Sequence, residues 1–162
     1  MSAVIRPVGI TDGRTLHFVS MTEHDLPEVV AIEDVVYPYP WTRGNFSDAL
    51  QSGYQNWVLR NDDGALLGYF LLMHAVDEAH LLNISVRDGL HGLGLGRTLL
   101  GKVVSLADAN LMASILLEVR PSNQRALKVY QRYGFIRIGD RKNYYPQANG
   151  QREDAIVMRF IL

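Results

Sequence analysis

The sequence predicts a single-domain α/β fold of about seven strands and about four helices. Segments of strand character alternate along the chain with segments whose apolar residues recur at helical spacing. The apolar segment 79–86 runs into a glycine-rich turn, which opens a helical pattern at 99–107. With 162 residues, 48% of them apolar, the chain suits one domain with a substantial core. The segment 1–13 is expected to be an irregular lead-in, and 14–162 the domain.

The amino-terminal part predicts one strand and then two helices. Residues 14–20 alternate between apolar and polar, which indicates a strand. Thr22 and Thr42 are candidate N-caps of the two helices. Trp41 precedes Phe46 by five residues, the spacing of a hydrophobic staple around the cap of the second helix. The first helix would turn four apolar residues inward: Leu26, Val29, Val30 and Val36.

The middle of the chain predicts a hairpin and then the strand before the glycine-rich turn. Segments 56–60 and 66–76 have strand composition, and a turn of two aspartates and Gly64 separates them. The segment 79–86 predicts the next strand. The helix after the glycine run would bury one stripe of apolar residues: Leu99, Leu100, Val103, Val104, Leu106 and Ala107.

The carboxyl-terminal part predicts a buried strand, a helix and two closing strands. Residues 115–119 are almost continuously apolar, which is typical of a strand covered on both faces. Ser122 is the candidate N-cap of the next helix, and Gly134 is its expected terminator. Segments 135–138 and 155–162 are the closing strands. The inward stripe of the helix would be Ala126, Val129, Tyr130 and Tyr133.

The glycine run between strand and helix is a candidate phosphate site. It comprises His91, Gly92, Leu93, Gly94, Leu95, Gly96 and Arg97. Glycine lets the backbone approach a ligand closely, and the first N–H groups of a helix favour an anion. The spacing matches neither the dinucleotide fingerprint G-x-G-x-x-G nor the P-loop. A plain strand-to-helix turn is the alternative interpretation.

Motifs elsewhere in the chain help to interpret the glycine run. The chain contains, in order, NISV, GLGLGRTLL, LEVRPSN, Y-x-x-x-G-F, RKNYYP and REDAIVM. This order resembles the GNAT superfamily of acetyl-CoA-dependent N-acetyltransferases, and within it the RimI-type ribosomal-protein-alanine N-acetyltransferases. The resemblance extends from about Met21 to Met158. The glycine run marks the superfamily alone, whereas LEVRPSN, NYYP and REDAI are more specific.

The resemblance implies a fold and an activity. It implies a mixed, mostly antiparallel twisted sheet and acetyl-CoA as co-substrate. The acceptor would be the N-terminal alanine of a small-subunit ribosomal protein, acetylated by direct transfer in the cytoplasm. Two alternatives stay open, namely an acetyltransferase for a small amine or lysine side chain, and a non-catalytic acyl-CoA-binding module.

Glu118 and Tyr130 are the candidate catalytic residues. Glu118 lies near the end of an apolar strand, where a carboxylate is costly unless paired. From the residues alone, it would pair with Arg120 on the same strand face or lie at a solvated strand end. Tyr130 alone would be helix core. The resemblance implies that Glu118 is the general base and Tyr130 the general acid.

The resemblance also implies coenzyme contacts. The main chain of Ile84, Ser85 and Val86 would pair with the pantetheine arm, and Asn123 would contact the coenzyme. The pyrophosphate would be held by the turn residues Gly92, Leu93, Gly94, Leu95, Gly96 and Arg97. His91 stands where the family usually has glutamine or arginine, so its side chain is not assigned a contact.

Candidate acceptor contacts are aromatic and acidic. Tyr37 and Tyr144, with Trp41 and Tyr145, could line the acceptor groove, or they could simply pack. Four acidic residues could attract a basic peptide or merely be solvated. They are Glu33, Asp34, Asp77 and Glu78.

Composition excludes several classes of function. The net charge of −1 gives no case for a nucleic-acid binder. The absence of cysteine excludes disulfides, thiolate metal sites and a cysteine-bound intermediate, and no metal site is expected. Since no apolar run reaches membrane-spanning length, a cytosolic enzyme is expected. The oligomeric state stays open.

Overall fold

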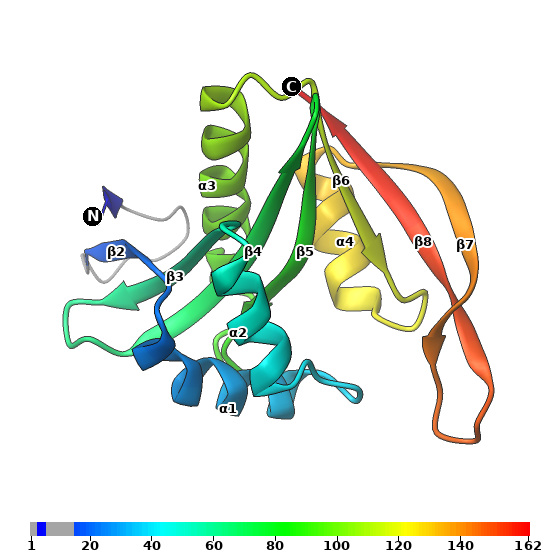
Figure 1. Cartoon of the computed structure of the whole chain (residues 1–162), viewed down its shortest axis with the longest axis horizontal. Coiled ribbons are helices and arrows are strands. Elements are labelled where there is room, and N and C mark those ends of the chain that lie inside the picture. The colour runs from blue at the N-terminus through cyan, green and yellow to red at the C-terminus, as the bar shows by residue number, and fades with distance from the viewer. Residues whose placement is uncertain (1–2, 6–14) are drawn as a thin grey trace.

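The computed structural model describes residues 3–5 and 15–162, which form an eight-stranded sheet with helices on both faces (Figure 1). The strands are β1 (Ala3–Ile5), β2 (Leu16–Ser20), β3 (Gln55–Asn61), β4 (Leu66–Ala75), β5 (Glu78–Val86), β6 (Ser114–Val119), β7 (Ile136–Pro146) and β8 (Arg152–Ile161). The helices are a short 3-10 turn η1 (Glu23–Asp25), α1 (Leu26–Val36), α2 (Arg43–Gln51), α3 (Leu95–Ala109) and α4 (Gln124–Tyr133). The seven strands from β2 onward and the four α-helices correspond to the predicted elements. The strand β1 is an addition, because it lies in the segment expected to be irregular, and the remainder of that segment falls outside the described residues.

The sheet is mixed and mostly antiparallel, as expected. Its strand order is β1-β2-β3-β4-β5-β6-β8-β7, and among the described strands only β5 and β6 run parallel. These two strands pair from Glu78 with Ser114 to Leu81 with Leu117. Beyond that point they diverge, and Figure 1 shows them meeting at one end and separating toward the other. The divergence leaves the stretch 82–86 of β5 without a partner strand on the β6 side.

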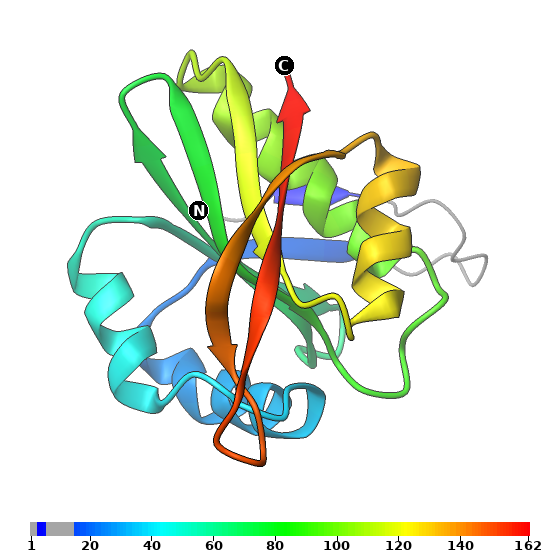
Figure 2. The same cartoon turned by 90° about the vertical axis from the view of Figure 1, so that its right-hand side faces the viewer.

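Two hydrophobic cores cover the two faces of the sheet. The core under α3 and α4 includes Leu99 and Val103. The core under α1 and α2 includes Val29, Phe46 and Tyr69. In Figure 2 the pair α3 and α4 lies on the opposite side of the sheet from α1 and α2. Because both faces are buried, the central strand β4 is apolar along almost its whole length.

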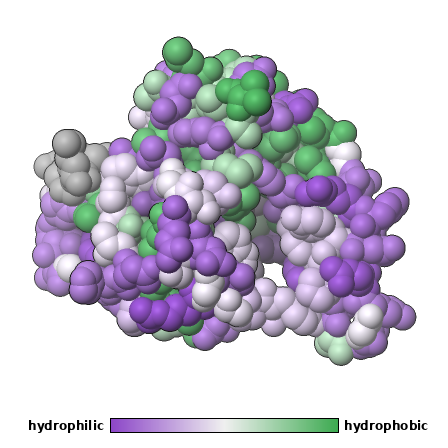
Figure 3. Space-filling view, in the orientation of Figure 1, coloured by the Kyte–Doolittle hydropathy of each residue, from purple (hydrophilic) through white to green (hydrophobic). Residues whose placement is uncertain are grey.

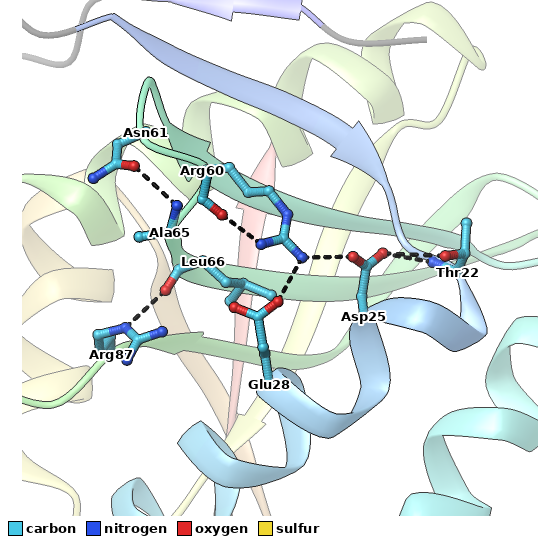
Figure 4. Close-up of polar contacts among 9 residues, drawn as sticks. Thr22, Asp25, Glu28, Arg60, Asn61, Ala65, Leu66 and Arg87 are labelled. Carbon is cyan, nitrogen blue, oxygen red and sulfur yellow. Dashed lines mark hydrogen bonds and ion pairs between the residues drawn. The ribbon is translucent and has the colours of Figure 1, made fainter.

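The start of α1 is fixed by a polar cluster (Figure 4). The backbone N–H of Thr22 donates to the Asp25 carboxylate at 2.8 Å in a capping box that begins the 3-10 turn η1. The N-cap of α1 itself is Asp25 and not Thr22, because the 3-10 turn lies between Thr22 and that helix. The Arg60 guanidinium in β3 donates to Asp25 at 2.6 Å and to Glu28 at 3.0 Å, and also to the Gly64 carbonyl at 2.7 Å. This cluster therefore joins the β3–β4 hairpin to α1. Of the predicted inward residues, two are buried and two partly buried in the same core: Leu26, Val29, Val30 and Val36.

The cap of α2 is the one predicted. The Thr42 hydroxyl accepts a hydrogen bond from the Asn45 N–H at 3.1 Å. The Trp41 and Phe46 rings lie with their centroids 5.2 Å apart, which confirms the staple. The entry of α2 is thereby set by residues that are close together in the sequence.

The cap of α4 differs from the prediction. Asn123, and not Ser122, is the N-cap, and its side chain accepts from the Ala126 N–H at 3.2 Å. The Ser122 N–H and hydroxyl instead donate to Glu153 at 2.9 and 3.1 Å, so this serine holds β8 rather than the helix. Gly134 ends α4 with a φ of +124°, as expected of a terminator.

The helix α3 is amphipathic. Its inward face buries Leu95, Leu99, Leu100, Val103 and Ala107, and the partly buried Val104 and Leu106 pack against the same core. No helix within residues 15–162 is both long and apolar enough to cross a membrane.

Candidate active site

A cavity of about 620 Å³ opens where β5 and β6 separate. Its walls come from β5, β6, the first turns of α4 and the segment between α1 and α2. In the space-filling view the surface is hollowed beside the β7–β8 lobe (Figure 3). The predicted site residues that line it are Tyr37, Ile84, Ser85, Val86, Gly96, Glu118, Asn123 and Tyr130. The predicted site residues outside its lining are Gly92, Leu93, Gly94, Leu95, Arg97 and Tyr144.

The free edge of β5 is one wall of the cavity. Ile84, Ser85 and Val86 lie beyond the last residue that pairs with β6. Main-chain groups at such an edge are able to pair with an extended ligand as a further strand would. The Tyr37 hydroxyl donates to the Ile84 carbonyl at 2.6 Å, so this acceptor has one protein partner and one lone pair left over.

The glycine turn adjoins one end of the cavity. Gly92 and Gly94 have φ values of +83° and +81°, a conformation that side chains resist, and Gly94 is the N-cap of α3. The N–H groups of the first turn of α3 have no acceptor within the helix. The Leu95 side chain is 2% exposed and packs in the core, so only its main chain faces a ligand. The turn thus has the backbone geometry of an anion site.

His91 is held by a neighbouring arginine. Its Nδ1 lies 2.6 Å from the Arg125 guanidinium, and both residues line the cavity. Burial, together with the positive charge of Arg125, lowers the pKa of His91 below its ordinary value. The imidazole is therefore neutral at pH 7 and accepts the hydrogen bond.

Glu118 is placed between an imidazole and a guanidinium. Its side chain is 13% exposed, with Oε2 at 2.7 Å from His80 Nε2 and Oε1 at 3.0 Å from Arg141 Nη1. Burial alone would raise the pKa of Glu118, but the hydrogen bonds and charges of His80 and Arg141 outweigh it and lower that pKa. Glu118 is thus a carboxylate at neutral pH, and it lines the cavity.

The expected pairing of Glu118 with Arg120 is wrong. Arg120 lies past the end of β6 and bonds instead to Glu153 at 3.4 Å and to the Pro146 carbonyl at 2.9 Å. Its guanidinium also lies over the ring of Tyr145, 4.4 Å from the centroid. The groups that hold Glu118, His80 and Arg141, were not predicted. A histidine between apolar residues of a strand and the arginine that opens RKNYYP were the available signals.

Tyr130 is a buried phenol that borders the cavity. It is 8% exposed, and its ring packs against Phe135 with centroids 5.8 Å apart. Burial raises the pKa of Tyr130 well above its ordinary value. The hydroxyl is therefore protonated at neutral pH and available as a donor to a group in the cavity.

The predicted acceptor aromatics divide into two groups. Tyr37, Trp41 and Tyr145 line the cavity. Tyr144 does not, since it packs against Tyr145 and under the Arg141 guanidinium, with 4.8 Å between ring centroids and 4.8 Å from guanidinium to ring. Of the acidic residues expected at the surface, Glu33 is instead buried and lines the cavity.

Comparison with known proteins identifies the family. Residues 26–135 match the model of the acetyltransferase (GNAT) family. The chain belongs to the GNAT family. Acetyltransferases of this family use acetyl-CoA as co-substrate, and the overall fold matches that of a solved N-acetyltransferase.

Relatives of this GNAT chain carry a consistent name. The [ribosomal protein bS18]-alanine N-acetyltransferase of Escherichia coli K12 is 35% identical over 139 residues, covering 86% of this chain and 93% of that protein. The protein of the same name from Haemophilus ducreyi is 31% identical over 143 residues, covering 88% and 98%.

Solved structures of other proteins share the fold of this chain. The ribosomal-protein-S18-alanine N-acetyltransferase of Escherichia coli superposes with a TM-score of 0.81 at 33% identity, covering 90% of this chain and 93% of that one. Ard1 from Thermoplasma volcanium superposes with a TM-score of 0.80 at 23% identity, covering 91% and 97%, which supports the fold alone.

Proposed function

We propose that this GNAT enzyme transfers the acetyl group of acetyl-CoA to the N-terminal alanine amine of ribosomal protein bS18. The observation that carries the proposal is that one cavity is lined by the Glu118 carboxylate, the Tyr130 phenol and the free edge of β5. The two named relatives, at 31% and 35% identity, act on bS18 by name and support the choice of acceptor. Tyr37 is proposed as a lining residue of the acceptor groove.

The proposed base is Glu118. A peptide α-amine titrates near ~7.7–8.0, so much of it arrives as ammonium at neutral pH. The lowered pKa of Glu118 keeps it ionised at neutral pH, where it is a weak base that would accept a proton through a bridging water and pass it on to solvent.

The proposed acid is Tyr130. The reaction forms the N–C bond of the amide and breaks the C–S bond of the thioester. Of the three ammonium protons, one stays on the amide and one is released to solvent by way of Glu118. Tyr130 protonates the departing thiolate, and the third proton, lost from nitrogen, restores the phenol.

The proposed coenzyme site runs from the edge of β5 to the glycine turn. The main chain of Ile84, Ser85 and Val86 would hold the pantetheine arm. The pyrophosphate would lie against the amides of the turn and first helical residues: Gly92, Leu93, Gly94, Leu95, Gly96 and Arg97. Asn123 at the start of α4 lines the same cavity and would contact the coenzyme.

Substituting valine for Gly94 is expected to weaken acetyl-CoA binding by more than about tenfold, or ~1.4 kcal/mol. The backbone φ of +81° is unfavourable for a β-branched residue, so valine would distort the turn whose amides are proposed to hold the pyrophosphate. Titration calorimetry with acetyl-CoA measures the change. Gly101→Val is the control, because Gly101 lies on an exposed face of α3 with open space around it. Unchanged affinity in Gly94→Val would refute the assignment.

Substituting glutamine for His91 is expected to leave acetyl-CoA affinity within about tenfold of wild type. The side-chain oxygen of glutamine is also able to accept from Arg125, which the imidazole does at 2.6 Å. The turn amides, which supply most of the proposed contacts, are unaffected. A larger loss in the same calorimetric assay would mean that the imidazole itself binds the coenzyme.

Transfer is expected to occur in a ternary complex without an acetyl-enzyme. The chain has no cysteine to carry the group. Initial rates with both substrates varied should give intersecting double-reciprocal lines. Parallel lines, or an enzyme mass raised by one acetyl group after incubation with acetyl-CoA alone, would contradict direct transfer.

The acceptor is tested by mass spectrometry of intact ribosomal proteins. Purified enzyme and acetyl-CoA are added to small-subunit proteins that lack N-terminal acetylation. One acetyl group on the bS18 terminus is expected, with the other proteins unchanged. Acetylation of lysine side chains or of a small amine, with bS18 unmodified, would redirect the assignment.

A further inference from the structure

Glu33 of α1 is a buried carboxylate with neutral partners. It is 1% exposed, and its Oε1 accepts from the Tyr69 hydroxyl at 2.6 Å and from Asn83 Nδ2 at 3.1 Å. Its Oε2 accepts from the backbone N–H of Trp41 at 2.9 Å. Within residues 15–162 no lysine, arginine or histidine forms an ion pair with it. A buried charge without a cation needs an explanation.

Stability does not provide that explanation. Burial raises the pKa of Glu33 in spite of the three hydrogen bonds, so the ionised form is disfavoured in the folded protein relative to water. Ionisation of Glu33 therefore lowers the stability of the fold. A buried carboxyl group whose ionisation weakens the fold and which lines the cavity points to a role in the site.

Glu33 accepts a hydrogen bond from each end of the segment between α1 and α2. Its backbone carbonyl accepts from the Tyr37 N–H at 3.0 Å, and its carboxylate accepts from the Trp41 N–H. The segment 37–41 between these two bonds contributes four residues to the cavity wall: Tyr37, Pro38, Tyr39 and Trp41. One residue thus fixes where this wall begins and where it ends.

We infer that Glu33 is a positioning residue that sets acceptor affinity by holding the segment 37–41 as a wall of the cavity. The inference rests on the proposed function, in which the segment that contains Tyr37 lines the acceptor groove. The bonds of Oε1 to β4 and β5 aim Oε2 at the segment. Release of the Trp41 N–H would loosen the wall without altering Glu118 or Tyr130.

The test is Glu33→Gln, assayed with acetyl-CoA and a short peptide that begins with alanine. The amide oxygen of glutamine is able to keep the bonds to Tyr69 and Asn83. The amide NH₂ group then faces the Trp41 N–H, and because both groups are donors the hydrogen bond to Trp41 is lost. The KM for the peptide is expected to rise about tenfold, with kcat and the KM for acetyl-CoA within about threefold. The thermal midpoint is measured alongside, because the lost Trp41 bond lowers stability whereas removal of a buried carboxylate raises it.

Glu28→Gln is the matched control. It makes the same change in the same helix, at a residue that pairs with Arg60 away from the cavity (Figure 4). Its peptide KM should equal that of wild type. An unchanged peptide KM in Glu33→Gln, or an equal rise in both KM values, would overturn the inference. If Glu33→Gln does not fold, Glu33→Asp keeps the charge but shortens the reach to Trp41, and the same rise is expected.

A second readout needs no activity. The chain has two tryptophans, and in a Trp57→Phe background Trp41 is the one that remains. Its fluorescence should be more strongly quenched by acrylamide when Glu33→Gln is added. Unaltered quenching would show that Glu33 does not hold the segment. Altered quenching in an enzyme that leaves bS18 unmodified would refute the proposed acceptor and leave the role of Glu33 in place.

Discussion

Glu118→Gln is expected to lower kcat at pH 7 by roughly 10²–10⁴-fold, with little change in acetyl-CoA affinity. The substitution keeps size and one hydrogen-bond acceptor for Arg141 or His80, but it removes the group proposed to take the amine proton. Initial rates with the alanine peptide, together with calorimetry, separate the two effects. Glu78→Gln is a control in the same sheet, because Glu78 is engaged by Arg159 at 3.0 Å and is not part of the cavity wall.

The pH dependence makes this prediction specific. His80 and Arg141 lower the pKa of Glu118, so the carboxylate is ionised across the neutral range. The wild-type rate should then rise with pH as the acceptor amine deprotonates, near ~7.7–8.0. Above that range the amine is already neutral, and Glu118→Gln should recover part of its activity. Full activity of the variant at pH 7, with an intact fold, would show that Glu118 has a structural role and is not the base.

Tyr130→Phe is expected to lower kcat by a similar factor, roughly 10²–10⁴-fold. Phenylalanine preserves the packing against Phe135, so circular dichroism and the thermal midpoint should change little. Because thiolate protonation does not depend on the state of the amine, raising the pH should not restore activity. Tyr133→Phe on the same helix is the control, since Tyr133 packs among Phe135 and Phe160 outside the cavity lining. Wild-type turnover in Tyr130→Phe would exclude it as the acid.

The parts of the fold that the sequence predicts well are set by contacts between residues close together in the chain. The Thr42 cap and the Trp41–Phe46 staple involve residues three to five positions apart, so their geometry follows from the helix itself. The choice of Ser122 as a cap failed for a non-local reason. Glu153 of β8 engages that serine and leaves the cap to Asn123.

The partners of Glu118 illustrate why the candidate site was only partly predictable. Residues at i and i+2 share a strand face, but β6 ends at Val119, so Arg120 turns toward Glu153. Arg141 of β7 reaches Glu118 of β6 across the intervening strand β8. Strand order is not written in any local pattern, and neither is the burial of Glu33.

The short parallel contact between β5 and β6 has a thermodynamic consequence. Backbone pairing between the two strands spans only four register pairs, from Glu78 to Leu81, so among strands β2 to β8 the sheet is least continuous there. A ligand that lies between the separated strands would bond to both halves of the sheet and occupy this seam. Coenzyme binding would then stabilise the contact between the two halves of the sheet. Saturating coenzyme is expected to slow hydrogen exchange of the amides of both strands, because it would slow the opening that exposes them.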